Sequence, residues 1–259
     1  MKNMKFIALC GLACLWVCAN CFAADPVITH SNGNKAGSGY SGSATTQNVT
    51  FPFTTVAGNT YVALMFWKND VNITSVSDDE GGNSWVDVGL GRVARPTDGY
   101  MQIYIASNVT GGTMPTVTMT LDGTGNNLAI SICEVQDVVS SSPVVAYGSG
   151  TATSGTSVST GSMSPGVSSG ISIARVDSNN GSPTAGTNYT VFRTYAGGSG
   201  DEEWSFGSDP GTIVADLTMS ATITKALIVA VVLKGVDAGG GGGTAVPVFL
   251  HHYRDLARR

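Results

Sequence analysis

From about residue 47 to 236 the chain is a succession of short apolar stretches separated by turn residues, and this pattern limits the possible folds most strongly. Residues 60–67 are almost continuously apolar, as in a strand that is buried on both faces. Residues 100–105 and 116–121 alternate apolar and polar side chains, which is the period of a strand with one buried face. No stretch of 47–236 carries a capped 3.6-residue apolar period. The sequence therefore predicts an all-β protein.

The strand pattern also repeats along the chain, at a spacing of roughly 100 residues. The matching pairs are an apolar strand at 60–67 and 171–176, an aromatic strand at 100–105 and 203–206, and a closing apolar strand at 128–135 and 226–233. We expect a jelly-roll-like antiparallel β-sandwich over 47–238, built from two Greek-key-like halves at about 47–138 and 153–236. The Ser/Gly/Thr-rich stretch from Val138 to Gly170 is expected to link them. Either one interlocked core or two sandwiches in tandem fits, and we favour the interlocked core.

The first 23 residues have the three parts of an export signal. Lys2 and Lys5 precede an apolar run over 6–17, and Cys21-Phe22-Ala23 provides small residues for cleavage. We expect cleavage before Ala24, and hence a secreted or cell-surface protein, periplasmic or extracellular. The alternative is an uncleaved membrane anchor, which is the only membrane contact we expect. Residues 24–46 are rich in Gly and Ser and are predicted to be a loose lead-in.

Cysteine content and charge narrow the class further. Four of the five cysteines fall within 1–23, so only Cys133 remains, and we expect it to be a small buried side chain. Residues 24–238 carry 8 Lys/Arg against 17 Asp/Glu, a net charge of −9. Such an acidic body argues against nucleic acid as a partner.

A family resemblance rests on residues spread over 47–236. They are Ile73-Thr74-Ser75-Val76, Trp85, the strand 100–105, Asn108 with Gly111-Gly112, Thr116-Val117-Thr118-Met119, Glu134-Val135-Gln136-Asp137-Val138 and Ser142-Pro143. The chain thereby resembles jelly-roll-like β-sandwich modules of bacterial secreted and surface proteins and of phage-associated proteins. The resemblance implies an adhesive or structural setting, on a cell surface or associated with a virion, and brings no catalytic residues. The strongly acidic stretch at 78–82 departs from that pattern.

The acidic turn is the candidate metal site. Asp78, Asp79, Glu80 and Asn83 place oxygen ligands on a Gly-rich turn, which suits Ca²⁺. The spacing is not that of an EF-hand loop, and a solvated hairpin turn explains the same residues. Calcium is the one cofactor that the sequence suggests, and we expect the hairpin turn.

Aromatic residues are the candidate ligand site. Tyr100, Gln102 and Tyr104 share one face of a strand and would form a flat ridge for a glycan if that face is exposed. The alternative is that this face packs against another layer. We expect Trp67, Trp85 and Trp204 to fill the core.

Catalytic motifs are missing from the sequence. His30, His251 and His252 are the only histidines, and they lie in the lead-in and the tail, away from every expected strand core. There is no Gly-x-Ser-x-Gly elbow or His-Glu-x-x-His helix. The carboxylates of 201–203 adjoin in sequence, unlike the facing pair of a glycosidase. We expect no enzymatic activity.

Residues 239–243 are five glycines and predict a flexible hinge before a distinct segment, 244–259. If a helix begins at Pro247, apolar side chains of this segment lie together on one face of that helix. The candidate docking residues are Val248, Phe249, Leu250, Tyr253 and Leu256. This tail would bind a second copy of the chain or a surface receptor. The alternatives are a frayed end and a helix that lies on a membrane surface.

Together these observations favour a non-enzymatic extracellular module for structure, adhesion or assembly, acting through sandwich faces and the tail. The alternative is a carbohydrate-binding module, possibly calcium-dependent.

Overall fold

The structure, a computed structural model, describes residues 25–35, 43–180, 183–186, 189–194, 201–205 and 213–236. These residues form antiparallel strands and turns, and no helix is present among them. The first half contains β1 (Val27–Lys35), β2 (Ser43–Thr50), β3 (Thr60–Lys68), β4 (Ile73–Asp78), β5 (Trp85–Asp87), β6 (Val93–Ala94), β7 (Tyr100–Ala106) and β8 (Thr116–Gln136). The second half contains β9 (Val144–Ala152), β10 (Ser157–Met163), β11 (Gly170–Ser178), β12 (Pro183–Ala185), β13 (Tyr189–Thr194), β14 (Asp201–Ser205), β15 (Ile213–Met219) and β16 (Ala226–Lys234). The predicted all-β antiparallel class is confirmed.

Several expectations concern other parts of the chain. The signal at 1–23, the glycine hinge at 239–243 and the segment 244–259 with its docking residues lie outside the described residues. Within the described ranges, no helix is long and apolar enough to cross a bilayer.

The first half is a two-layer sandwich, and one long strand, β8, runs through both layers. Its larger sheet has the order β1-β8-β3-β7-β5, and β6 adds to β7. β8 continues into the second layer, where its first part pairs with β2 and β4. The part of β8 from Asn126 onward pairs with β3, and its last residues also pair with β1.

The second half repeats this strand order. Its larger sheet runs β9-β16-β11-β14-β13 and its smaller one β10-β15-β12. β9, β16, β11, β14 and β13 take the places of β1, the end of β8, β3, β7 and β5. The three expected pairs of matching strands therefore occupy equivalent positions.

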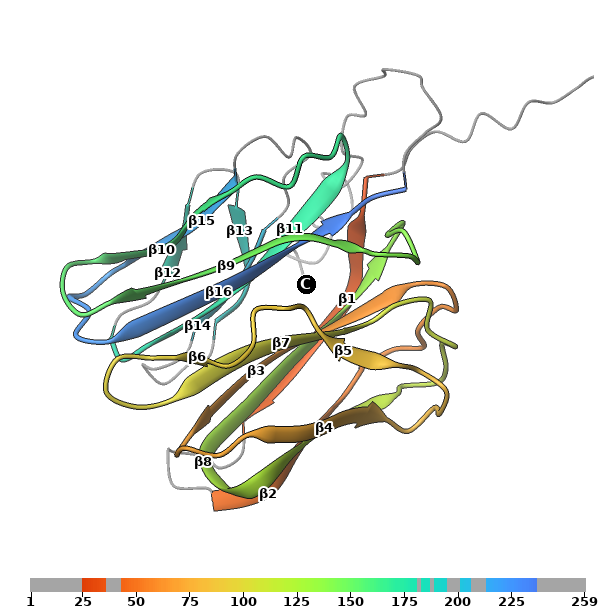
Figure 1. Ribbon diagram of the computed structural model, residues 1–259, viewed down its shortest axis with the longest axis horizontal. Coiled ribbons are helices and arrows are strands. Elements are labelled where there is room, and N and C mark those ends of the chain that lie inside the picture. Colours follow the sequence, from red (N-terminus) through yellow and green to blue (C-terminus); the bar gives the residue numbers. More distant parts are fainter. Residues whose placement is uncertain are drawn as a thin grey trace, which may run out of the picture.

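The two larger sheets face each other, and the smaller sheets lie on the outside (Figure 1). Each half has a core between its own two layers, and a third core lies between the halves. The molecule thus combines features of both arrangements that fit the sequence: separate sandwich cores, and a core to which both halves contribute.

The continuous apolar runs are explained by burial on both faces. In β3, Val62, Leu64 and Phe66 enter the shared core, whereas Tyr61, Ala63, Met65 and Trp67 enter the core of the first half. β16 divides its side chains in the same way between the shared core and the core of the second half. Cys133 on β8 is completely buried, as expected.

Two segments differ from the expectation. The lead-in at 24–46 contains β1, which pairs with β8 over most of its length, and part of β2. The linker at 138–170 contains β9 and β10. Both were missed because they are polar and glycine-rich. At Gly150 a Cβ would lie 1.7 Å from the carbonyl oxygen of Ser159, so the close approach of β9 and β10 requires glycine there.

Candidate functional site

The expected aromatic ridge lies on β7 and is half-buried. The Tyr100 ring stacks on Trp67, with ring centroids 5.9 Å apart, and the Arg92 guanidinium lies 4.2 Å from the Tyr100 centroid. Gln102 Nε2 donates to the hydroxyl of Tyr104 at 3.2 Å and also to the carboxylate of Asp87. These side chains border the core of the first half, so they do not form an open flat platform.

The acidic turn between β4 and β5 directs its carboxylates to different protein donors. Asp78 accepts from Trp85 Nε1 at 2.7 Å and from the side-chain amide of Asn83 at 3.1 Å. Asp79 accepts from the backbone N–H of Thr116 at 2.7 Å. Within the described ranges, no group of three or more His, Cys, Asp or Glu side chains could hold a metal ion. Calcium binding remains a prediction that the geometry does not test.

Glu134 is the centre of a buried polar network in the first half. Its side chain lies on β8 and is completely buried. Oε1 accepts from the backbone N–H of Val56 at 2.6 Å and from Asn59 Nδ2 at 2.7 Å. Oε2 accepts from Thr29 Oγ1 at 2.9 Å and contacts His30 Nδ1. Both oxygens are occupied, so the network fixes structure and does not present a free base.

This network corrects the expectation for His30. The sequence places His30 in a loose lead-in, yet it lies on β1 beside a buried carboxylate. Its ring also packs against Phe53, with centroids 5.2 Å apart. His30 therefore connects the buried network to the loop that carries Phe53.

A second polar group extends the network along β3. Tyr61 lies opposite Glu134 in the ladder, and its hydroxyl bonds to Thr55 Oγ1 at 2.5 Å and donates to Glu80 Oε2 at 3.1 Å. Burial raises the pKa of Tyr61 well above its usual value, and the charges of Glu80 and Glu134 raise it further. Burial likewise raises the pKa of Glu80, although the hydrogen bond from Tyr61 opposes this. The phenol is thus a neutral donor that ties the loop to the acidic turn.

Two loops, 51–59 and 107–115, lie side by side above this network, and we call them the loop platform. Backbone N–H groups of Phe51, Thr55 and Gly58 donate across to the second loop at 2.8–2.9 Å. Gly111 has a φ of +68°, and a Cβ there would lie 2.5 Å from the backbone nitrogen of Ala57. The loops are therefore held together by backbone bonds, close approach and the anchor from Val56 to Glu134.

The loop platform displays apolar side chains. Phe53 is 58% exposed, Val56 56% and Met114 48%. Seven large hydrophobic side chains are exposed in the described ranges, and these three of the seven lie on the two adjoining loops. Clustered exposed apolar groups on a fixed loop indicate a contact surface.

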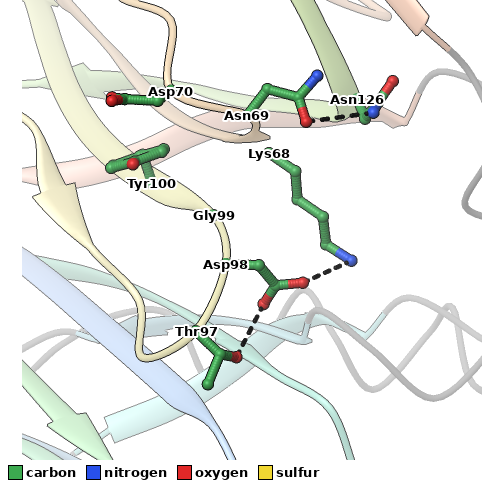
Figure 2. A pocket seen from close by; sticks show the side chains of 8 residues that line it. All are labelled: Lys68, Asn69, Asp70, Thr97, Asp98, Gly99, Tyr100 and Asn126. Carbon is green, nitrogen blue, oxygen red and sulfur yellow. Dashed lines mark hydrogen bonds and ion pairs between the residues drawn. The ribbon is translucent and has the colours of Figure 1, made fainter.

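A second feature is an open depression of about 400 Å³ that is lined by residues of the first half (Figure 2). We call it the seam depression, because its Asp98 bonds to Lys225 of the second half. Tyr100 forms one wall together with Asp70. Asn69 and Asn126 bond to each other at 3.2 Å, and Lys68 lies 3.1 Å from Asp98. Its lining is mostly amide, carboxylate, ammonium and hydroxyl groups.

Charged groups connect the two halves next to this depression. Asp98 accepts from Lys225 of the second half at 2.8 Å and from Arg95 at 2.8 Å. Arg95 also pairs with buried Asp177 on β11. Burial disfavours the Asp98 carboxylate, but hydrogen bonds from Lys225 and Lys68 and the charge of Arg95 hold its pKa well below the usual value.

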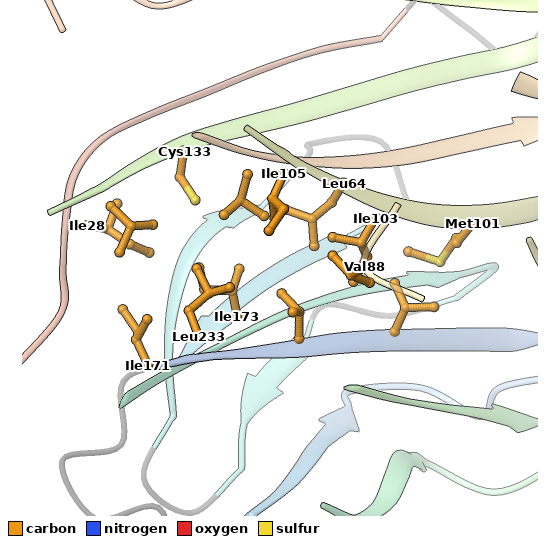
Figure 3. Packing of buried hydrophobic residues seen from close by; sticks show 14 of the residues in the cluster. Ile28, Leu64, Val88, Met101, Ile103, Ile105, Cys133, Ile171, Ile173 and Leu233 are labelled. Carbon is orange, nitrogen blue, oxygen red and sulfur yellow. The ribbon is translucent and has the colours of Figure 1, made fainter. Parts of the chain in front are cut away.

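Apolar side chains form the shared core at the seam: Figure 3 shows Leu64 and Ile103 of the first half facing Ile173 and Leu233 of the second. Arg175 crosses it and donates to the carbonyl oxygen of Leu64 at 2.6 Å. The halves are therefore fixed to each other by apolar packing and by specific polar bonds.

Comparison with known protein families, with curated proteins and with solved structures finds no match. The functional argument therefore depends on the geometry described above.

The sequence did not reveal the loop platform or the Glu134 network. One available signal was Phe51-Pro52-Phe53, in which two aromatic side chains flank a turn residue outside any strand pattern. The long-range partners of Glu134 left no such signal. Trp67 is fully buried as expected, whereas Trp85 is half-buried and donates to Asp78. The side chain of Trp204 lies outside the described set.

Proposed function

We propose that this chain is a non-enzymatic extracellular module for structure, adhesion or assembly, which acts by surface contact through the loop platform and the apolar segment 244–259. The observation that carries the proposal is the joint exposure of Phe53 and Val56, at 58% and 56%, on a loop fixed to a buried carboxylate.

Rigidity makes these side chains effective contacts. Ordering a loop on binding costs free energy, and here the loop is already bonded to its neighbour and to Glu134. Burial of each of Phe53 and Val56 against a partner contributes about 1.5–3 kcal/mol. Loss of both contacts therefore lowers affinity at least tenfold, since about 1.4 kcal/mol corresponds to one order of magnitude.

The test is retention of the purified protein on the surface of cells that produce it. Wild type is expected to sediment with the cells, and the Phe53→Ser/Val56→Ser variant is expected to lose at least tenfold in retention. Val86→Ser/Val214→Ser is the matched control, because Val86 is 51% and Val214 37% exposed on other elements. Equal retention of all three proteins would overturn the proposal.

The seam depression favours carbohydrate binding as a second candidate function. Asn69 and Asn126 offer amide donors and acceptors for sugar hydroxyls, and Tyr100 contributes an aromatic edge. Titration with a panel of oligosaccharides tests this candidate. Asp70→Asn is the test variant, because Asp70 lines the depression and its side chain is 76% exposed. Weaker sugar binding by this variant, with no change for the exposed Tyr147→Ala control, would support the candidate. Absence of binding by wild type would end it.

A further inference from the structure

The last described strand brings the chain to the first strand. Gly235 forms a bridge with Val138, and a Cβ on Gly235 would lie 2.7 Å from Pro26 Cδ. The chain therefore continues toward residues 237–259 from a point beside Pro26.

This point is close to the loop platform. His30 follows Pro26 by four residues, and β1 spans about 13 Å over that interval at the rise of a strand. The His30 ring lies 5.2 Å from the Phe53 ring. Phe53 is thus on the order of 20 Å from the place where β16 ends.

The intervening chain has a suitable length. Residues 236–243 include five consecutive glycines. Eight residues of a glycine-rich chain have an r.m.s. end-to-end distance of about 14–17 Å and reach about 26–29 Å when extended. The effective concentration of a tethered segment is greatest when this distance matches the span.

The segment and the platform are complementary in chemistry. Residues 244–259 combine apolar side chains, Phe249 and Leu250 among them, with three arginines and one aspartate. The platform exposes Phe53, Val56 and Met114, and the acidic turn borders it, because the exposed carboxylate of Asp79 accepts from the backbone N–H of Thr116 just after the second loop. Apolar side chains of the segment can therefore contact the exposed apolar side chains of the loops while an arginine pairs with the carboxylate of Asp79.

We infer that residues 244–259 dock on the loop platform of their own chain and cover Phe53 and Val56, so that an outside partner must displace them. This inference rests on the proposed function, because it names how the same surface is regulated. A short glycine-rich tether gives an effective concentration in the millimolar range, so below that protein concentration the chain's own segment prevails over that of a second copy.

Disulfide trapping tests the inference in the full chain. Cys10, Cys14, Cys18 and Cys21 are replaced by serine, Cys133 is buried, and the pair Val56→Cys/Leu250→Cys is introduced. We expect an intramolecular disulfide whose rate of formation does not change on tenfold dilution. The matched pair Val214→Cys/Leu250→Cys, on the outer sheet of the second half, is expected to react at least tenfold more slowly.

Added substitutions test the specificity of docking. Phe53→Ser in the trapping background is expected to slow the disulfide at least fivefold, and Val86→Ser to leave it unchanged. Equal rates at positions 56 and 214, or a disulfide-linked dimer that disappears on dilution, would overturn the inference. If trapping fails but surface retention still depends on Phe53, the proposed function stands. If trapping succeeds but surface retention does not depend on Phe53, only the proposed function is overturned.

Discussion

Single buried polar residues determine how the loops are held. Glu134 accepts bonds from Thr29, Val56 and Asn59 at 2.6–2.9 Å, and these donors come from two separate segments. Glu134→Ala would leave those donors without their acceptor. We expect a loss of about 3 kcal/mol or more in unfolding free energy, because each unsatisfied buried donor costs about 1–3 kcal/mol. Urea denaturation measures this, and Glu134→Gln, which keeps one acceptor oxygen, should lose less. An unchanged midpoint for Glu134→Ala would contradict the role of the network.

Ionisation of Asp98, at the seam between the halves, makes the unfolding free energy depend on pH. Its pKa is lowered in the folded protein, so its contribution to stability is complete above the unfolded value of about 3.9 and is lost as pH falls toward the folded pKa. Asp98→Asn should therefore lower the unfolding free energy by about 1–2 kcal/mol at pH 7. Denaturant midpoints of the two proteins should converge as pH falls below 4. A difference that is constant from pH 7 to pH 2.5 would show that ionisation of Asp98 is not involved.

At the scale of elements, close packing of polar strands depends on glycine. Gly150→Ala on β9 would place a methyl group against the backbone oxygen of Ser159, which cannot rotate away. We expect a loss of about 1–3 kcal/mol in unfolding free energy, measured by urea denaturation. Ser149→Ala on the same strand is the control and should change little. Equal stability of both variants would mean that β9 and β10 are farther apart than described.

The same elements show what the sequence could predict. β3 and β16 were identified because side chains on both of their faces are buried, which produces an uninterrupted apolar run. β1 and β9 were missed because their sequences lack a clear apolar period. Backbone pairing with β8 and β16, which joins residues distant in sequence, holds them in the sheets. The ridge was placed correctly on a strand, β7. The hairpin expected at the acidic turn is wrong, because β4 pairs with β8 and β5 pairs with β7, so the turn joins strands of different layers. The partners of their side chains could not be predicted, because those contacts join residues distant in sequence.

The whole molecule is two sandwiches of the same strand order whose larger sheets bury each other. Separating the halves would expose the apolar face of both sheets and break the Arg95–Asp177 and Lys225–Asp98 pairs. We therefore expect one cooperative unfolding transition in calorimetry, with equal calorimetric and van 't Hoff enthalpies. Two resolved transitions would show that the halves unfold independently.

The central claim is that the loop platform is the surface by which this molecule makes contact. Site-specific photo-crosslinking on producing cells tests it most directly, with a photoreactive amino acid at position 53 and, in separate proteins, at positions 86 and 214. We predict covalent adducts with a component of the cell surface from position 53 and none from 86 or 214, all three being exposed apolar positions. Adducts of equal yield from all three positions, or none from position 53, would contradict the claim.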